Sequence, residues 1–404
     1  MSTVVIVGAG QAGYQVAASL RDKGYRGRVV LVGNEPGIPY QRPPLSKAYL
    51  TGALADARLA LRPMTFYAKH DIELVAGHAV GIDRECHRLR LADGRELEYG
   101  HLVLATGTRN RELSVPGAQL DGVLGLRTKA DADRIRQRLG TARDIVVIGG
   151  GFIGLEFAAS AAKLGLTVTV VEVADRVMRR AVSPVVSQHY EALHERHGNR
   201  VVRGVPVAGL HGTQHVTAVE LADGTVLLAG VVVVGIGVVP NTELAAEAGL
   251  AVDNGVVVDT HMSTSDPDIS AIGDCAAYPS RHTGRHVRLE SVQNAVDHAR
   301  CLAARLTGTA EPYTSLPWFW SEQFDARLQI AGISDGYDNA VVRGDPTEGA
   351  FSVFCFRGER LVAVESVNRV PDHMAARRLL AAGRSLRPAD VVDSFDLRSY
   401  AAAS

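Results

Sequence analysis

The stretch IVVIGGGFIGLE at residues 145–156 nearly repeats VVIVGAGQAG at residues 4–13. In both copies a run of β-branched residues leads into a glycine-rich turn and then into a helical pattern of small residues. The first copy continues to VVLVGNE at 29–35, and the second continues to VTVVE at 168–172. Strand, turn, helix and strand in this order predict a parallel sheet covered by helices. We therefore expect an α/β fold with two Rossmann-like dinucleotide-binding domains.

The three glycines of each turn have separate tasks. The first allows the tight turn, the second lets a pyrophosphate approach the backbone, and the third lets helix and strand pack closely. The helix that follows offers unpaired N–H groups and the positive end of its dipole to phosphates. A lone G-x-G-x-x-G is weak evidence, but each copy here follows a strand, opens a helix and leads to a strand that ends near an acid. The glycines concerned are Gly8, Gly10, Gly13, Gly149, Gly151 and Gly154.

The acid at the end of each unit stands in a different place. Glu172 directly ends the second unit, where it can accept hydrogen bonds from an adenosine ribose. A 2′-phosphate would meet this carboxylate, which favours NADH over NADPH, although the arginines within 176–180 weigh against strict selectivity. In the first unit Gly33 takes the corresponding position, and either Asn34 or Glu35 is expected to hold the ribose.

Composition excludes several classes of protein. The 404 residues carry a net charge of −1, whereas nucleic-acid-binding proteins usually show a strong basic excess. The longest apolar run, residues 226–239, is too short and too rich in glycine to span a bilayer, so we expect a buried strand. No secretion signal precedes the first strand, which favours a cytoplasmic protein. The cysteines lack paired spacing, so we predict no metal site. They are Cys86, Cys275, Cys301 and Cys355.

Four further segments extend this picture. Residues 101–109 read as a strand ending in small residues, and residues 264–276 read as a strand ending in Asp274. In flavoproteins that bind two dinucleotides, such an aspartate holds the ribityl chain of FAD. Ser291 is expected to cap a helix that starts at Val292. Asn241 or Thr242 is expected to cap another helix.

The pattern of predicted elements changes at about residue 314. Residues 351–367 predict two strands around a tight turn at Arg357–Arg360. Residues 372–383 then predict an amphipathic helix that ends on Gly383. These patterns indicate a separate C-terminal α+β domain.

The whole chain resembles the FAD-dependent NADH:ferredoxin reductases, a group of the glutathione-reductase-like flavoproteins that includes the putidaredoxin reductase and palustrisredoxin reductase type. The likeness is carried by PYQRPPLSKAYLTG at 39–52, RLESVQNAVDHA at 288–299 and LPWFWSEQFDARLQIAG at 316–332. The resemblance implies the following domains: FAD-binding, 1–112 and 242–313; NADH-binding, 113–241; and C-terminal, 314–404.

The resemblance also implies roles for single residues. It places Lys47 beside flavin N5, paired with Glu156, whereas a helix-dipole role is the alternative for Glu156. Both would act by orientation and electrostatics, because hydride passes directly between the two cofactors. The helix N-terminus at Val292 would face the flavin, and Trp320 would lie beside it, unless Trp318 and Trp320 are both core residues. The other FAD contacts implied are Ala12, Asn34, Glu35, Arg42, Val80, Ala105, Thr106, Gly107, Arg127 and Asp274. On the NADH side they are Ile153, Glu172, Arg180 and Gly237.

The electron acceptor is inferred from what the chain lacks. Disulfide reductases of this fold carry C-x-x-x-x-C where this chain has RPPLSK at 42–47, and no cysteine precedes Cys86. Electrons must therefore leave from the flavin, which favours a one-electron acceptor, a 2Fe–2S ferredoxin that supplies a haem-thiolate monooxygenase. The alternatives are the reductase of an aromatic-ring dioxygenase, a rubredoxin reductase and an NADH-sensing interaction protein.

A ferredoxin of this kind is usually acidic, so its docking edge should be basic. Transient, salt-sensitive docking on a protein that is itself a monomer would suit turnover. The candidate docking residues are Arg300, Arg305, Arg377, Arg378, Arg384 and Arg387.

Overall fold

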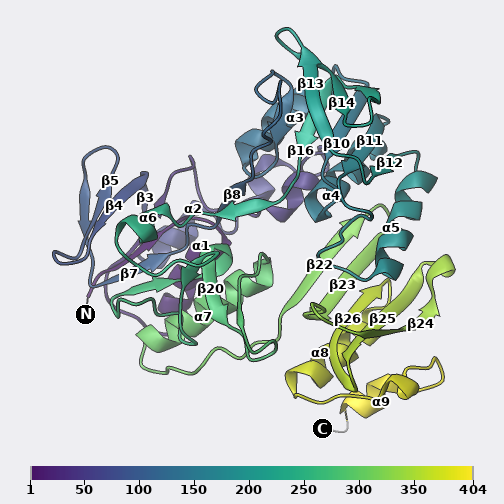
Figure 1. Cartoon of the computed structure of the whole chain (residues 1–404). Coiled ribbons are helices and arrows are strands. Elements are labelled where there is room, and N and C mark those ends of the chain that lie inside the picture. The colour runs from purple at the N-terminus through teal and green to yellow at the C-terminus, as the bar shows by residue number, and fades with distance from the viewer. Residues whose placement is uncertain (1, 403–404) are drawn as a thin grey trace. The chain divides into compact units, whose positions relative to one another are not determined.

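A computed structural model describes residues 2–402, so the last two positions of the expected C-terminal domain lie outside the described residues (Figure 1). The chain forms two compact units. The first comprises the residues up to Gln41 together with Ala57–Arg109 and Val239–Ser315. The second comprises Arg42–Asp56, Asn110–Val238 and the chain from Leu316 onward.

The first unit is built on a parallel sheet in the order β19-β7-β1-β2-β3. Val4 of the central strand lies opposite Val29 on one side and His101 on the other. The strands are β1 (Val4–Val7), β2 (Val29–Gly33), β3 (Ile72–Ala76), β7 (His101–Leu104) and β19 (Ile269–Ala271). The helices are α1 (Gln11–Asp22), α2 (Met64–Lys69), α6 (Glu243–Glu247) and α7 (Val292–Leu306).

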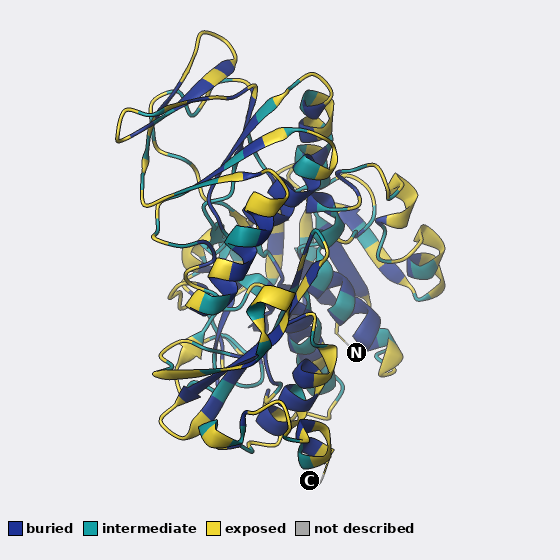
Figure 2. Ribbon diagram, turned by 90° about the vertical axis from the view of Figure 1, so that its right-hand side faces the viewer, coloured by how far each residue is buried: buried dark blue, intermediate teal, exposed yellow. Residues whose placement is uncertain are grey.

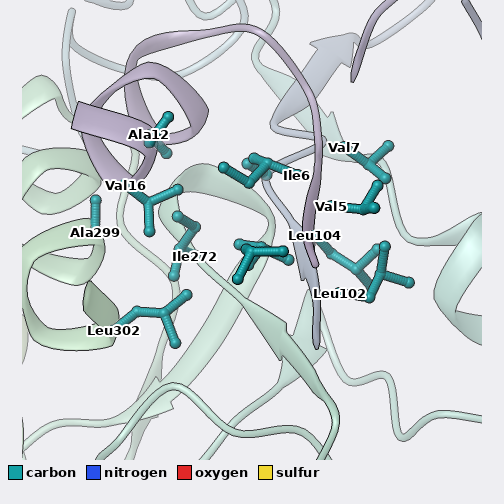
Figure 3. Close-up of a cluster of buried hydrophobic side chains, with 14 of the residues drawn as sticks. Val5, Ile6, Val7, Ala12, Val16, Leu102, Leu104, Ile272, Ala299 and Leu302 are labelled. Carbon is teal, nitrogen blue, oxygen red and sulfur yellow. The ribbon is translucent and has the colours of Figure 1, made fainter. Parts of the chain in front are cut away.

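The core of the first unit joins segments that are distant in sequence. Figure 3 shows Ile272 between Val16 of α1 and Leu302 of α7, with the side chains of β1 beside them. Each of these three side chains is 0 % exposed. The small residues of α1 and α7 let both helices lie close to the sheet, so the first glycine turn is held on a rigid base.

Short strands complete the first unit. They are β4 (Ala79–Asp83), β5 (Arg88–Leu91), β6 (Glu96–Glu98), β18 (Val256–Val257), β20 (Ala276–Pro279) and β21 (His286–Val287). Two more strands, β8 (Thr108–Asn110) and β17 (Val238–Pro240), carry the chain from one unit to the other.

The second unit repeats the design with a parallel sheet in the order β12-β11-β10-β16-β9. Its strands are β9 (Val123–Gly125), β10 (Asp144–Ile148), β11 (Thr167–Glu172), β12 (Arg200–Arg203) and β16 (Val231–Val234). Its helices are α3 (Lys129–Leu139), α4 (Phe152–Lys163) and α5 (Pro184–Arg196). A three-stranded sheet, β13 (Val207–Gly212), β14 (Val216–Leu221) and β15 (Val226–Leu228), adjoins them.

The expectation of one buried strand at 226–239 is wrong. The run is divided into β15, β16 and β17, because its glycines interrupt strand pairing. Val226 and Leu228 are 56 % and 73 % exposed, since β15 lies at the edge of its small sheet.

The C-terminal part of the second unit is an antiparallel sheet in the order β22-β23-β26-β25-β24 with two helices. The predicted hairpin is confirmed by the pairing of β25 with β26, and the predicted helix is confirmed but begins two residues earlier, at Val370. Gly383 follows it with φ +67°. The elements are β22 (Trp318–Gln323), β23 (Ala326–Gly332), β24 (Asn339–Asp345), β25 (Ala350–Arg357), β26 (Arg360–Val367), α8 (Val370–Ala381) and α9 (Leu397–Ala402).

Buried and exposed residues alternate along several helices (Figure 2), and α3, α5 and α8 follow this amphipathic pattern, whereas α1 and α4 are buried over most of their length. Among residues 2–402, no helix has both the length and the apolar character needed to cross a bilayer.

Candidate active site

The first glycine turn leaves no room for side chains at two of its positions. Gly8 has φ +112°, and a Cβ there would lie 2.2 Å from the carbonyl oxygen of Ala105. A Cβ at Gly13 would lie 1.9 Å from the carbonyl oxygen of Gly8. These contacts hold the turn against the end of β7, which is the place where a dinucleotide meets this type of sheet.

The start of α1 is free to bind an anion. Gly10 is its N-cap and, having no side chain, makes no cap hydrogen bond to the first N–H groups of the helix. Among the described residues, nothing lies within 4 Å of the position that a Cβ at Gly10 would take. An open cradle of backbone donors at a helix N-terminus fits a pyrophosphate.

Asp274 lies close to this cradle, but not at the end of a strand as expected. Strand β19 ends at Ala271, and Asp274 lies in a 3-10 turn, Gly273–Cys275. Gly273 has φ +75°, and a Cβ there would meet the Cβ of Ala12 at 2.9 Å. The turn is therefore packed on the first turn of α1, which a strand ending at Asp274 would not allow.

The segment after β7 is fixed by a residue whose role the sequence did not reveal. Asn241 donates from Nδ2 to the Thr106 carbonyl at 2.9 Å, and Thr106 Oγ1 donates to the Asn241 carbonyl at 2.7 Å. The backbone N–H of Asn241 also donates to the Gly107 carbonyl at 3.0 Å. The expected side-chain cap at Asn241 or Thr242 is wrong. The Asn241 side chain donates to the Thr106 carbonyl instead, and Thr242, at the N-cap position of α6, makes no side-chain cap hydrogen bond.

The acid of the first unit is held by a tyrosine. Glu35 Oε2 accepts a hydrogen bond from the Tyr40 hydroxyl at 2.5 Å, whereas Asn34 is exposed. At the end of β2, a Cβ on Gly33 would lie 2.7 Å from the Cβ of Ala9, so no side chain fits there.

The second glycine turn has nearly the same geometry. Gly149 has φ +110°, and a Cβ there would lie 2.4 Å from the Gly235 carbonyl oxygen. A Cβ at Gly154 would lie 2.1 Å from the Gly149 carbonyl oxygen. Gly151 is the N-cap of α4, again without a side-chain cap, and Ile153 beside it is 47 % exposed. This turn therefore also fits a pyrophosphate.

Glu172 completes the second turn. Its Oε2 accepts from the Gly150 N–H at 2.7 Å, and its Oε1 accepts from the Ala174 N–H at 2.8 Å. Both carboxylate oxygens are thus oriented by backbone donors at the carboxyl end of β11. This position suits an acceptor for the hydroxyls of an adenosine ribose.

The arginines near Glu172 differ in their surroundings. Arg176 donates to the Val182 carbonyl at 2.8 Å and to Ser187 Oγ at 2.6 Å, so its guanidinium is used inside the loop. Arg179 pairs with Asp175 at 3.2 Å. Arg180 is exposed, and its Nη2 lies 3.3 Å from the position of a Cβ on Gly237, which has φ +97°.

The ion pair expected between Lys47 and Glu156 is present. Lys47 Nζ lies 2.6 Å from Glu156 Oε2, and the Glu156 side chain is only 3 % exposed. Ser46 Oγ donates to Oε2 at 2.8 Å, and Ser321 Oγ donates to Oε1 at 2.8 Å. Glu156 lies beyond the first turn of α4, which begins at Phe152, so a helix-dipole role does not explain it.

Other predicted residues lie in both units: Arg42, Trp318 and Trp320 in the second, and Val80 in the first. Arg42 donates to the Arg127 carbonyl at 2.7 Å. Trp318 and Trp320 are half-buried and their rings are 5.4 Å apart, so neither is a full core residue. In the first unit, Val80 is 43 % exposed on β4.

The predicted helix cap at Ser291 is confirmed, because its Oγ accepts from the Asn294 N–H at 3.0 Å. At the other end of α7, Arg305 donates to Ser263 Oγ, and also to Ser270 Oγ at 2.5 Å. The expectation that Arg305 serves in docking is therefore wrong, since its guanidinium is taken up inside the unit. Arg300 on the same helix is 64 % exposed.

The chain is similar to known proteins along almost its whole length. The family description of pyridine nucleotide-disulphide oxidoreductases matches residues 2–299, and a reductase C-terminal domain matches residues 318–401. Rhodocoxin reductase of Rhodococcus erythropolis is 53 % identical over 399 residues, covering 98 % of this chain and 93 % of that protein.

Two solved structures are similar as well. The ferredoxin reductase of Rhodopseudomonas palustris has a TM-score of 0.97 at 51 % identity and covers 99 % of each chain. A covalent putidaredoxin reductase–putidaredoxin complex has a TM-score of 0.97 at 43 % identity, covering 100 % of this chain and 98 % of that one. The predicted fold class and the resemblance are confirmed.

Proposed function

Because this chain belongs to the pyridine nucleotide-disulphide oxidoreductase family, we propose that it passes electrons from NADH through FAD to a 2Fe–2S ferredoxin, which supplies a haem-thiolate monooxygenase. Family membership confirms that the chain is an oxidoreductase and that its cofactors are FAD and a pyridine nucleotide. The preference for NADH, the acceptor and the roles of single residues belong to the proposal.

One observation carries the proposal: Lys47, on the segment 42–47 where disulfide reductases of this fold have two cysteines, forms an ion pair with the buried Glu156 of α4. A chain without cysteines in this segment lacks the usual relay to a disulfide substrate. An acceptor that takes electrons from the flavin itself is then required.

Bound FAD would supply the chemistry, accepting hydride from NADH and releasing two electrons one at a time. The residues of the chain bind the two dinucleotides and orient them. The glycine turns and the uncapped starts of α1 and α4 hold the pyrophosphates, while Glu35 and Glu172 hold the riboses. The Glu156 carboxylate fixes the Lys47 ammonium in one position, so the cation needs no rearrangement when charge develops near it.

The proposed domains follow the two glycine turns. Residues 1–112 and 242–313 would bind FAD, residues 113–241 would bind NADH, and residues 314–404 form the C-terminal domain. Exposed Arg300, whose closest carboxylate contact is Asp297 at 3.9 Å, is the docking residue we propose for an acidic ferredoxin. We also propose a monomeric protein of the cytoplasm.

The first test is anaerobic mixing of the flavin-loaded protein with NADH. We expect rapid bleaching of the flavin absorbance, followed by steady-state reduction of cytochrome c only when a ferredoxin is added. Slow bleaching with a long-lived charge-transfer band would instead indicate an NADH sensor. A panel of purified ferredoxins and rubredoxins separates the proposed acceptor from that of a dioxygenase reductase or a rubredoxin reductase.

The docking proposal is tested by Arg300→Glu. We expect a higher apparent KM for ferredoxin and unchanged bleaching by NADH, because Arg300 is exposed and distant in sequence from both glycine turns. An unchanged KM would exclude Arg300 from the docking face.

A further inference from the structure

Glu365 is a carboxylate buried inside the C-terminal sheet. It lies on β26 and its side chain is 0 % exposed. Burial raises its pKa, because an ionised carboxylate loses its hydration there. A buried carboxylate is costly unless it is fully hydrogen-bonded, so its partners show what it is for.

The start of helix α5 donates hydrogen bonds to this carboxylate. The backbone N–H of Ser183 donates to both Glu365 oxygens, at 3.0 and 2.9 Å, and Ser183 Oγ donates to Oε2 at 2.6 Å. Ser183 is the N-cap of α5, but its hydroxyl caps no helix N–H and is directed to Glu365. A carboxylate at a helix N-terminus also interacts favourably with the helix dipole. The C-terminal domain thus fixes the first residue of a helix that belongs to the NADH-binding part.

The loop that ends at Ser183 starts at Glu172. Midway along this loop, the Met178 N–H donates to the Gly150 carbonyl at 2.9 Å, and Met178 has φ +50°. A non-glycine residue in the left-handed region is strained and persists only where its surroundings hold it. The loop is therefore packed against the second glycine turn and hydrogen-bonded to it through Met178 and Gly150.

Hydrogen bonds within this loop, and between it and α5, make it rigid. Arg176 donates to the carbonyls of Val182 and Arg179, at 2.8 and 2.9 Å. It also donates to Ser187 Oγ at 2.6 Å, and Ser187 Oγ in turn donates to the Val177 carbonyl at 2.6 Å. A shift of α5 at Ser183 would therefore be transmitted to the residues that lie next to Glu172.

We propose that Glu365 is a positioning residue for the adenosine half of NADH. It does not touch the nucleotide. By holding Ser183, it keeps the loop 173–182 in place over the second glycine turn, so the C-terminal domain contributes to nucleotide binding. This inference rests on the proposed use of NADH by the second unit.

The test compares ligands that contain the adenosine half with one that lacks it. In Glu365→Ala we expect the Kd for ADP-ribose and the KM for NADH to rise about tenfold, as the loss of charged hydrogen bonds predicts. The kcat at saturating NADH should be retained. Flavin reduction by reduced nicotinamide mononucleotide, which has no adenosine, should proceed as in the wild type.

Two further variants keep the test decisive. Glu359→Gln changes an exposed carboxylate in the turn of the same hairpin and should alter none of these values. If Glu365→Ala does not fold, Ser183→Ala removes the hydrogen bond from the Ser183 hydroxyl to Glu365 and should raise the Kd for ADP-ribose by a smaller factor.

Two outcomes would overturn the inference. One is a Kd for ADP-ribose that does not change in the folded variant, and the other is an equal loss with the mononucleotide, which would indicate general damage. Failure of the wild-type flavin to bleach with NADH would instead refute the proposed function.

Discussion

The two glycine turns follow the same backbone path yet place their acids differently. The first glycines have φ +112° and +110°, and a Cβ would lie 2.2 and 2.4 Å from a carbonyl oxygen in each case. The residue after this glycine is Ala9 in the first turn and Gly150 in the second. The neighbouring strand ends in Gly33 in the first unit and in Glu172 in the second.

These two differences have one cause. A Cβ on Gly33 would lie 2.7 Å from the Cβ of Ala9, and a Cβ on Gly150 would lie 3.2 Å from the Cβ of Glu172. The turn residue and the strand-end residue therefore compete for the same space. In the first unit the methyl group of Ala9 occupies this space, so the strand ends in glycine and the acid stands two positions later, at Glu35. In the second unit glycine in the turn makes room for the carboxylate.

The largest expected effect comes from placing a side chain at the first glycine of either turn. Gly8→Ala should yield protein without FAD, because alanine at this φ is strained and its Cβ meets the Ala105 carbonyl. Gly149→Ala should keep its FAD but lose bleaching by NADH. The ratio of flavin to protein absorbance and the bleaching rate measure the two effects.

A matched control for both variants is Gly140→Ala. Gly140 lies at the end of α3 with φ −64°, a value that alanine adopts without strain. It should retain flavin and bleaching. If Gly149→Ala lost FAD as well, or if Gly8→Ala kept it, the assignment of one nucleotide to each turn would be refuted.

A double-mutant cycle examines the shared space directly. Gly33→Ala should lower the free energy of unfolding by about 1–3 kcal/mol, the usual cost of overpacking. Adding Ala9→Gly should recover most of this loss, since it removes the methyl group that Gly33→Ala would meet at 2.7 Å. Denaturant unfolding of the two single variants and the double variant gives the coupling. Simple additivity would show that the two positions do not compete.

The next effect concerns the choice of pyridine nucleotide. Glu172→Arg should lower kcat/KM for NADH about tenfold and raise it for NADPH, because a cation replaces a carboxylate at the ribose position. Glu172→Gln retains an oxygen that can accept from the Gly150 N–H, so it should be milder. Unchanged nucleotide preference in Glu172→Arg would remove Glu172 from the ribose site.

The smallest effect is a pH dependence of stability that both units share. Burial lowers the pKa of His298 in the first unit to about 3 and that of His194 in the second to about 4. The unfolded histidines gain protons below their ordinary pKa of 6.5, whereas the folded ones do not. The contribution of these two histidines to the free energy of unfolding is therefore fully present above about pH 6.5. It is lost as the pH falls from 6.5 toward the lowered pKa of the folded state.

In His298→Gln or His194→Gln the fall of Tm over this acidic range should be shallower than in the wild type, whatever the change in Tm itself. Thermal unfolding at several pH values provides the slope. An unchanged slope in both variants would show that these histidines do not carry the acid sensitivity.

Local patterns in the sequence predicted local structure well. The strands and helices of both glycine turns, the cap at Ser291 and the hairpin of β25 and β26 are signalled by residues within a few positions of one another. Such features depend on backbone geometry and periodicity, which neighbouring residues determine.

Contacts between distant residues were not predictable in this way. Glu365 and Ser183 are 182 positions apart, and Ser321 and Glu156 are 165 apart. No spacing rule links such pairs, because only the completed fold brings them together. Lys47 and Glu156, 109 positions apart by their numbers, were paired only through the resemblance to a known family.

The interleaved path of the chain has a consequence for biosynthesis. The sheet of the first unit needs β19, and its core needs Leu302 of α7, so it cannot close until these residues have left the ribosome. The parallel sheet of the second unit uses only strands between Val123 and Val234. Because domains generally fold as the chain emerges, the glycine turn that is translated first is supported last. A nascent chain halted before α7 would hold a finished second sheet and an unfinished first one.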